Sequence, residues 1–245
     1  MYHLKLFKTI NEKQNSKPLT ILVKFVTIKS GDTMNYIDIL NTDYYKEIYS
    51  KIEELKKDFP VNHGFIHINN VIENAKRLAI TFNLDNKQTE LLLIAAALHD
   101  IGYLFGKEDH AYNGGIYSKE LLETWNFDKK DIEIISNAIA NHGGKKKEEY
   151  EDIISMCLIC ADKLDFINTR YDITRLKEEY LSTFPYITNT YLDYKNSTTT
   201  LTIEVTKNFD IAIFKVSSYY NKLERFLTLL SERLNSKFNI NFNVK

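Results

Sequence analysis

Apolar residues recur every three or four positions over most of the first two thirds of the chain. This spacing predicts helices, because it places the apolar side chains on one face of each α-helix. Asp85, Asp109 and Asp128 each precede a predicted helix and are expected to cap it, since a carboxylate accepts hydrogen bonds from the free amides of a first turn. We expect helices over 44–58, 65–82, 86–99, 110–125, 129–142, 153–167, 173–182 and 211–234.

Two shorter segments alternate between polar and apolar residues, and a third is rich in β-branched residues. Segments 198–206 and 238–244 alternate and predict strands, and the β-branched segment 19–28 predicts a short strand or a poorly ordered stretch. Only 8 glycines and 3 prolines interrupt the chain, which favours long helices over a many-stranded sheet. The expected fold is therefore mainly α, a helical bundle with a small α+β C-terminal appendage.

Three parts of the chain differ in character. Residues 1–33 form an N-terminal segment, residues 34–172 the helical domain, and residues 185–245 the α+β appendage. Met34 begins a sequence of different texture and could be an internal start, so the sequence leaves open whether residues 1–33 belong to the functional protein.

Composition narrows the function classes. The 32 Lys and Arg residues nearly balance the 33 Asp and Glu residues, so there is no global basic field and no clear nucleic-acid patch. The longest apolar run, Leu91–Leu98, is far shorter than the ~20 residues of a membrane span. The pair Cys157 and Cys160 lies in an apolar helix, where core packing is the better interpretation. We expect a soluble cytoplasmic protein with no membrane partner, and a homo-oligomer stays open.

Histidines and acids lie beside the apolar faces of the helices. His99 and Asp100 follow an almost wholly apolar helix, and a buried carboxylate is costly unless it is paired or binds a cation. His67 lies four residues before Val71 on its buried stripe, and similar spacing places His142, Asp162 and Asp165 inward. Alone, each would be a hydrogen-bonded core residue or a cap, but together they indicate a bundle-core metal site.

These residues resemble the HD superfamily of metal-dependent phosphohydrolases over about residues 60–170. The first signature is H-x-x-x-V at His67–Val71, the second is ALHDIGY at Ala97–Tyr103, and the third is ICADKLDF at Ile159–Phe166. His110 and His142 look like the two additional histidines of binuclear members. Asn70 departs from the family pattern, because many relatives carry Arg there, and many also carry Lys where Tyr103 stands.

The resemblance implies a ligand set and a reaction. His67, His99, Asp100 and Asp162 would hold a first divalent ion, and Asp100 would bridge to a second ion held by His110 and His142. One or two ions of Mn, Fe, Co, Zn, Ni or Mg are expected. Asp100 would act in catalysis by orienting a metal-bound water. The implied reaction is hydrolysis of a phosphate ester or anhydride, with a small nucleotide-like substrate as the partner.

Other residues are weaker candidates. Lys107, Lys145, Lys146 and His63 could contact substrate, although a solvated loop balanced by Glu148 and Glu149 is the favoured interpretation of the lysines at 145 and 146. The pair Gly114–Gly115 inside a helical pattern is explained if a backbone or a substrate approaches closely there.

Two alternatives remain. A di-iron oxygenase of the same superfamily would use a similar ligand set and would consume oxygen. A non-catalytic binding protein would hold metal but turn over no phosphate compound.

Overall fold

The computed structural model describes residues 9–10, 19–20 and 34–245. The short strands β1 (Thr9–Ile10) and β2 (Leu19–Thr20) pair antiparallel. The strand predicted over 19–28 begins at β2, and its remaining residues lie outside the described part of the chain.

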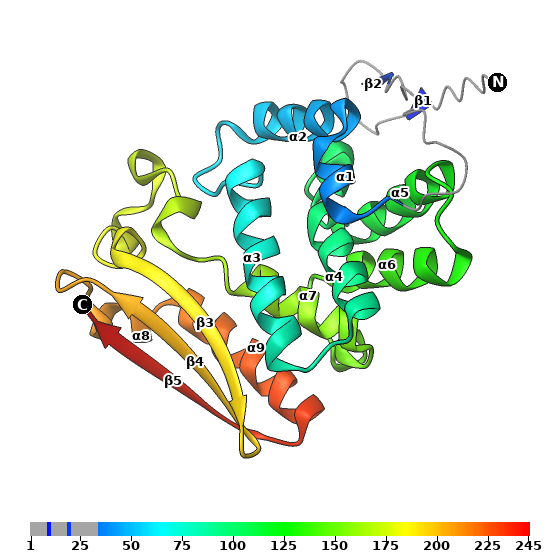
Figure 1. The fold of residues 1–245 in the computed structure, drawn as a ribbon. Helices are drawn as coiled ribbons and strands as arrows, with labels where there is room; N and C mark the ends of the chain where they lie inside the picture. The colour runs from blue at the N-terminus through cyan, green and yellow to red at the C-terminus, as the bar shows by residue number, and fades with distance from the viewer. Residues whose placement is uncertain (1–8, 11–18, 21–33) are drawn as a thin grey trace.

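Helices dominate residues 36–163 and form a bundle (Figure 1). The capping roles of Asp85 and Asp128 are confirmed, because their carboxylates accept from Gln88 and Lys130 amides. Asp109 is not a side-chain cap, because it lies in the left-handed region with φ 53° and makes no capping bond. The elements are α1 (Tyr36–Asn41), α2 (Asp43–Lys56), α3 (Phe65–Thr81), α4 (Asn86–Leu98), α5 (His110–Thr124), α6 (Lys129–Asn141) and α7 (Ile153–Lys163).

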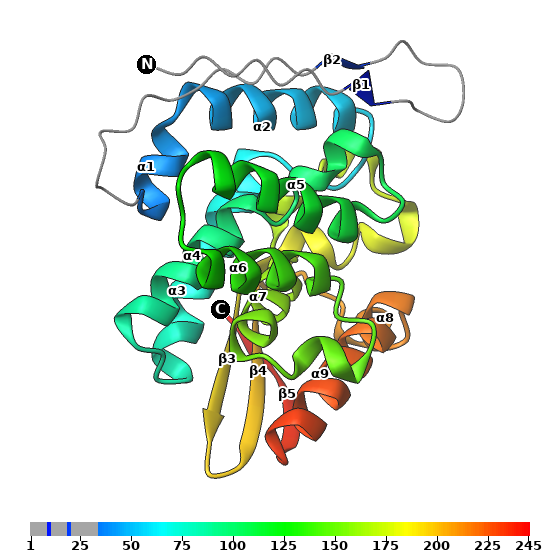
Figure 2. The ribbon, with the colours of Figure 1, turned by 90° about the vertical axis from the view of Figure 1, so that its right-hand side faces the viewer.

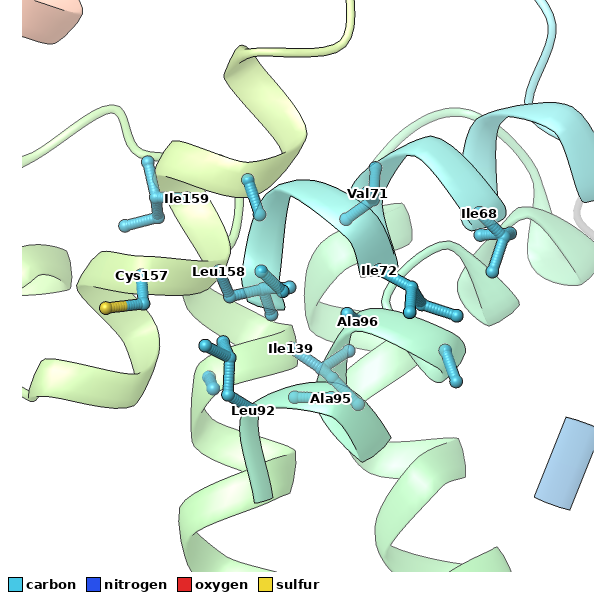
Figure 3. Close-up of a cluster of buried hydrophobic side chains, with 14 of the residues drawn as sticks. Ile68, Val71, Ile72, Leu92, Ala95, Ala96, Ile139, Cys157, Leu158 and Ile159 are labelled. Carbon is cyan, nitrogen blue, oxygen red and sulfur yellow. The ribbon is translucent and has the colours of Figure 1, made fainter. Parts of the chain in front are cut away.

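Helix α4 is the centre of the hydrophobic core. Every residue from Leu91 to Leu98 is buried, because α1, α3, α6 and α7 surround this helix. Figure 3 shows a cluster of buried side chains from α3, α4, α6 and α7, and Cys157 is among them. Cys157 and Cys160 are free thiols buried in this packing, and burial raises their pKa values. Within the described residues, no single helix is long and apolar enough to cross a membrane, and the one pair long enough together is bent by 113°.

Glycines set the close approach of α5 to its neighbours. A Cβ on Gly115 would lie 2.8 Å from both the Cβ of Ala140 and the carbonyl oxygen of Ser136 in α6. A Cβ on Gly102, in the 3-10 helix η1 (Ile101–Phe105), would lie 1.9 Å from the carbonyl oxygen of His110. The glycine pair in α5 is therefore explained by the approach of neighbouring backbone.

The helix predicted over 173–182 is wrong. The segment forms two 3-10 turns, η4 (Ile173–Arg175) and η5 (Glu178–Tyr180), separated by extended residues. The Asp172 side chain accepts hydrogen bonds from the amide and hydroxyl of Thr174, which offers the backbone an alternative to helix. Helix α7 is likewise shorter than predicted and ends at Lys163.

A three-stranded sheet forms the C-terminal part, with strand order β3-β4-β5. Strands β3 (Ile187–Lys195) and β4 (Thr198–Val205) form an antiparallel hairpin, whereas β5 (Lys237–Val244) runs parallel to β4. Strand β3 was missed by the sequence pattern. The helix predicted over 211–234 is two helices, α8 (Ile211–Lys215) and α9 (Ser218–Leu234), because the Ser217 side chain caps a new helix.

The sheet lies to one side of the bundle, with β3 beside α3 (Figure 1), and α9 packs against β5 and α7 (Figure 2). The mainly α fold class with a small α+β appendage is confirmed. The boundaries 34–172 and 185–245 stay predictions.

Candidate metal centre

Helix ends carry the residues that the sequence singled out. His67 lies in the first turn of α3, His110 is the first residue of α5, and Asp162 lies in the last turn of α7. His99 and His142 follow α4 and α6 directly. Because these helix ends meet, the fold brings together all six residues expected from the sequence, His67, His99, Asp100, His110, His142 and Asp162, and His63 joins them.

The first group of ligand atoms surrounds the Nε2 atoms of His67 and His99, which are 3.1 Å apart. Asp100 Oδ2 lies 3.3 Å from His67 Nε2 and 3.4 Å from His99 Nε2. Asp162 Oδ1 lies 3.4 Å and 3.9 Å from the same two nitrogens. Ligands bound at ~2.1 Å to one ion are roughly 3.0–3.4 Å apart in octahedral or tetrahedral geometry, so most of these spacings fit a shared cation.

The second group uses the other oxygen of Asp100. His110 Nε2 and His142 Nε2 are 3.2 Å apart, and they lie 3.9 Å and 3.6 Å from Asp100 Oδ1. Asp100 therefore presents one carboxylate oxygen to each pair of imidazoles. His63 approaches from outside, with its Nδ1 3.0 Å from Asp100 Oδ2.

Each of the four imidazoles whose Nε2 atoms face one another forms a hydrogen bond through its Nδ1 atom. His99 Nδ1 donates to the carbonyl of Ala96 at 2.9 Å, and His142 Nδ1 donates to that of Ile139 at 2.7 Å. His110 Nδ1 likewise donates to the Lys107 carbonyl at 3.0 Å. Carbonyl oxygens only accept, so Nδ1 carries the hydrogen and a neutral ring directs its Nε2 lone pair into the cluster.

For His67, the acceptor at Nδ1 is the carboxylate of Asp165 instead of a backbone carbonyl. Its Oδ2 accepts from His67 Nδ1 at 2.6 Å and from Arg170 Nη1 at 2.9 Å. Its Oδ1 accepts from the Asn70 side-chain amide at 3.0 Å. Arg170 is buried against the His67 ring, and the sequence pattern did not single it out as part of the centre. A charged network thus orients His67, whose Nδ1 faces a carboxylate where the other three paired imidazoles face backbone carbonyls.

The electrostatics follow from burial and from these contacts. Burial disfavours a charged His67, but hydrogen bonds to three carboxylates outweigh it and raise its pKa well above the usual value. Burial and the neighbouring His99 lower the pKa of His142 to about 3. Burial alone would raise the pKa values of Asp100 and Asp162, yet His99, His63 and His67 around Asp100, and Lys163 and His67 around Asp162, hold both pKa values well below the usual range. The acids are therefore ionised and His142 is neutral near neutral pH.

One nearby lysine contacts an expected metal ligand, whereas two others do not. Lys163 bonds to Asp162 Oδ2 at 2.8 Å, although its helical position alone would direct it about 100° away. Lys145 and Lys146 are exposed, and their backbone amides donate to Glu149. No contact joins either of these two ammonium groups to the cluster within residues 34–245, so their substrate role stays a prediction.

Comparisons with known proteins point to one family. The HD domain family model matches residues 64–167, a range that holds all six clustered residues. An uncharacterised protein of Clostridium beijerinckii is 29% identical over 133 residues, which cover 51% of this chain and 80% of that protein. A crystal structure described as a predicted HD superfamily hydrolase, from an uncultured Thermotogales bacterium, is 30% identical. The match covers 55% of this chain and 75% of the chain in that crystal structure, with a TM-score of 0.40.

Proposed function

The chain belongs to the HD superfamily through residues 64–167, and we propose that it is a divalent-metal-dependent phosphohydrolase. The reaction proposed is cleavage of a phosphate ester or anhydride in a small nucleotide-like substrate. The observation that carries the proposal is the position of Asp100, whose two carboxylate oxygens face two different pairs of imidazole nitrogens.

The donor set fits cations between its members. In their neutral forms, His110 and His142 direct two Nε2 lone pairs at each other 3.2 Å apart, an arrangement that is repulsive unless a cation lies between them. In the other pair, 3.1 Å apart, His67 carries a proton that a bound ion would displace. Mixed imidazole and carboxylate ligands suit Fe, Mn, Zn or Co. We therefore propose one ion held by His67, His99, Asp100 and Asp162, and a second held by Asp100, His110 and His142.

Bound ions of this kind supply a water that ionises near neutral pH and a Lewis acid for phosphoryl oxygens. Asp100 lies between the two groups and can orient that water through either carboxylate oxygen. Substrate would approach from the side of His63, His110 and Asp162, because their side chains are 17%, 25% and 15% exposed while those of His67 and His99 are fully buried. Lys163 lies on this open side and can neutralise a phosphoryl oxygen.

The proposal is tested by loading the purified protein with Mn²⁺, Fe²⁺, Co²⁺ or Zn²⁺ and measuring phosphate release. The substrates are mononucleotides, dinucleotides, cyclic nucleotides (with an added phosphatase to release phosphate from diester products) and sugar phosphates. Asp100→Asn should abolish turnover, whereas Asp193→Asn on β3 should leave it unchanged. Substrate loss that needs both iron and oxygen would contradict the hydrolase, as would full activity in Asp100→Asn.

A further inference from the structure

Two lysines from different elements meet at an exposed aromatic ring beside the metal centre. Lys56 is the last residue of α2, and Lys107 lies in the loop between η1 and α5. Their Nζ atoms lie 4.8 Å and 5.9 Å from the ring centroid of Phe59, which is 44% exposed. Lys56 is half-buried and Lys107 is exposed, so the pair is accessible to a ligand.

Tyr103 connects this pair to the centre. Lys56 Nζ lies 4.3 Å from the Tyr103 ring centroid. The same ring stacks on His110 at 4.2 Å and contacts His63 at 4.4 Å between centroids. One aromatic side chain therefore separates the Lys56 ammonium from the imidazoles on the open side of the cluster.

The acids next to Lys56 have other partners. Glu53 accepts from the Phe65 amide at 2.9 Å, Glu54 pairs with Lys57, and Asp58 pairs with Arg175. Within residues 34–245, neither Lys56 nor Lys107 forms an ion pair with an acid. Burial, and then the charge of Lys107, lower the pKa of Lys56, whereas the charge of Asp100 opposes this change.

Two cations held together without an acid are unfavourable for the fold and favourable for an anion. We propose that Lys56 and Lys107 form an anion subsite for a distal phosphate, while the phosphoryl group to be cleaved lies at the metal centre. This inference rests on the proposed function and deepens it. It assigns the substrate class as organic diphosphates and longer polyphosphates, such as nucleoside diphosphates, ahead of monophosphates.

Binding of two non-hydrolysable probes to the metal-loaded protein tests the subsite. Methylenediphosphonate carries a proximal and a distal anion, whereas methylphosphonate carries the proximal one alone. Calorimetric titration should give a wild-type preference for the diphosphonate. The double variant Lys56→Gln, Lys107→Gln should bind it about tenfold more weakly, and methylphosphonate within about twofold of wild type.

A charge-matched control separates a local subsite from general electrostatics. Lys195→Gln with Lys222→Gln removes the same charge from exposed positions on β3 and α9, and binding of both probes should stay unchanged. Equal weakening of both probes in the Lys56 and Lys107 variant, or no weakening, would overturn the subsite. These outcomes leave phosphate release by the wild type intact, so they are distinct from failure of the proposed function. Conversely, absence of phosphate release would refute the hydrolase, while the binding comparison would still decide the subsite.

Discussion

Asp165 Oδ2 lies 2.6 Å from Nδ1 of His67, and 98 residues of sequence separate the two. The contact fixes the orientation of an imidazole whose other nitrogen faces Asp100 and Asp162. The hydrogen bond at the ring nitrogen that does not face the metal site fixes both the tautomer and the ring orientation of a ligating histidine.

Removing the charge of Asp165 should therefore weaken metal binding. Asp165→Asn is expected to lower affinity for the first ion by about 10–100-fold, because His67 loses its anionic acceptor. Competition against a chromophoric chelator measures the change. Asn70→Ala is the matched control, since it removes a bond to the other oxygen of the same carboxylate and leaves the His67 contact intact. A folded Asp165→Asn protein with wild-type affinity would refute this role.

The approach of η1 to α5 should make Gly102 intolerant of a side chain. The Cβ of Gly102→Ala would lie 1.9 Å from the His110 carbonyl oxygen and 2.6 Å from the Gly114 amide nitrogen, and both are backbone atoms. We expect destabilisation by about 1–3 kcal/mol, measured by urea unfolding. The same shift would displace His110 and weaken the second metal group.

Gly143→Ala is the control for that substitution. Its Cβ would meet only the Lys145 side chain, at 4.0 Å, so the unfolding free energy should change by no more than about 0.5 kcal/mol. Equal stability of the Gly102→Ala protein and the wild type would show that the close approach does not constrain the fold.

Metal uptake should release a proton near neutral pH. The pKa of His67 is raised well above its usual value, so the metal-free protein holds a proton there that a bound ion must displace. His142 is already neutral, with a pKa lowered to about 3, and Asp100 and Asp162 are already ionised. Apparent metal affinity should therefore rise with pH until it passes the pKa of His67.

Calorimetric metal titrations in buffers of different ionisation enthalpy give the number of protons released. We expect about one proton from His67 for each protein molecule loaded. His142→Asn should leave this number unchanged, because that ring carries no proton to lose. Heats that do not depend on the buffer would contradict the assignment.

The clustered residues were predictable from sequence because periodicity reports the inward face of a regular helix. His67, His142 and Asp162 occupy positions in phase with apolar neighbours, and their convergence follows once the helices pack. His110 and Asp100 lie at helix ends, and the family motifs located them. Resemblance and periodicity together thus identified, as metal ligands, six of the seven residues that the structure brings together, and the seventh, His63, was expected only as a substrate contact.

Residues outside regular phase were not predictable in the same way. Arg170 lies in a 3-10 turn, and Lys163 returns to Asp162 through a flexible side chain that helical position does not describe. Strand β3 was missed because Ile187–Lys195 mixes buried and polar positions without strict alternation. Its burial depends on contact with α3 and β4, which no local pattern encodes.

Metal content is the most direct measurement of the central claim, that Asp100 joins two cation sites. Protein reconstituted with Mn²⁺ or Zn²⁺ and freed of excess ion should hold two ions per chain by elemental analysis. The double variant His110→Ala, His142→Ala should hold one ion per chain. In Asp100→Ala both sites lose a ligand, so each should be only partly occupied. Two ions retained in the double variant, or none bound by folded wild-type protein, would contradict the account.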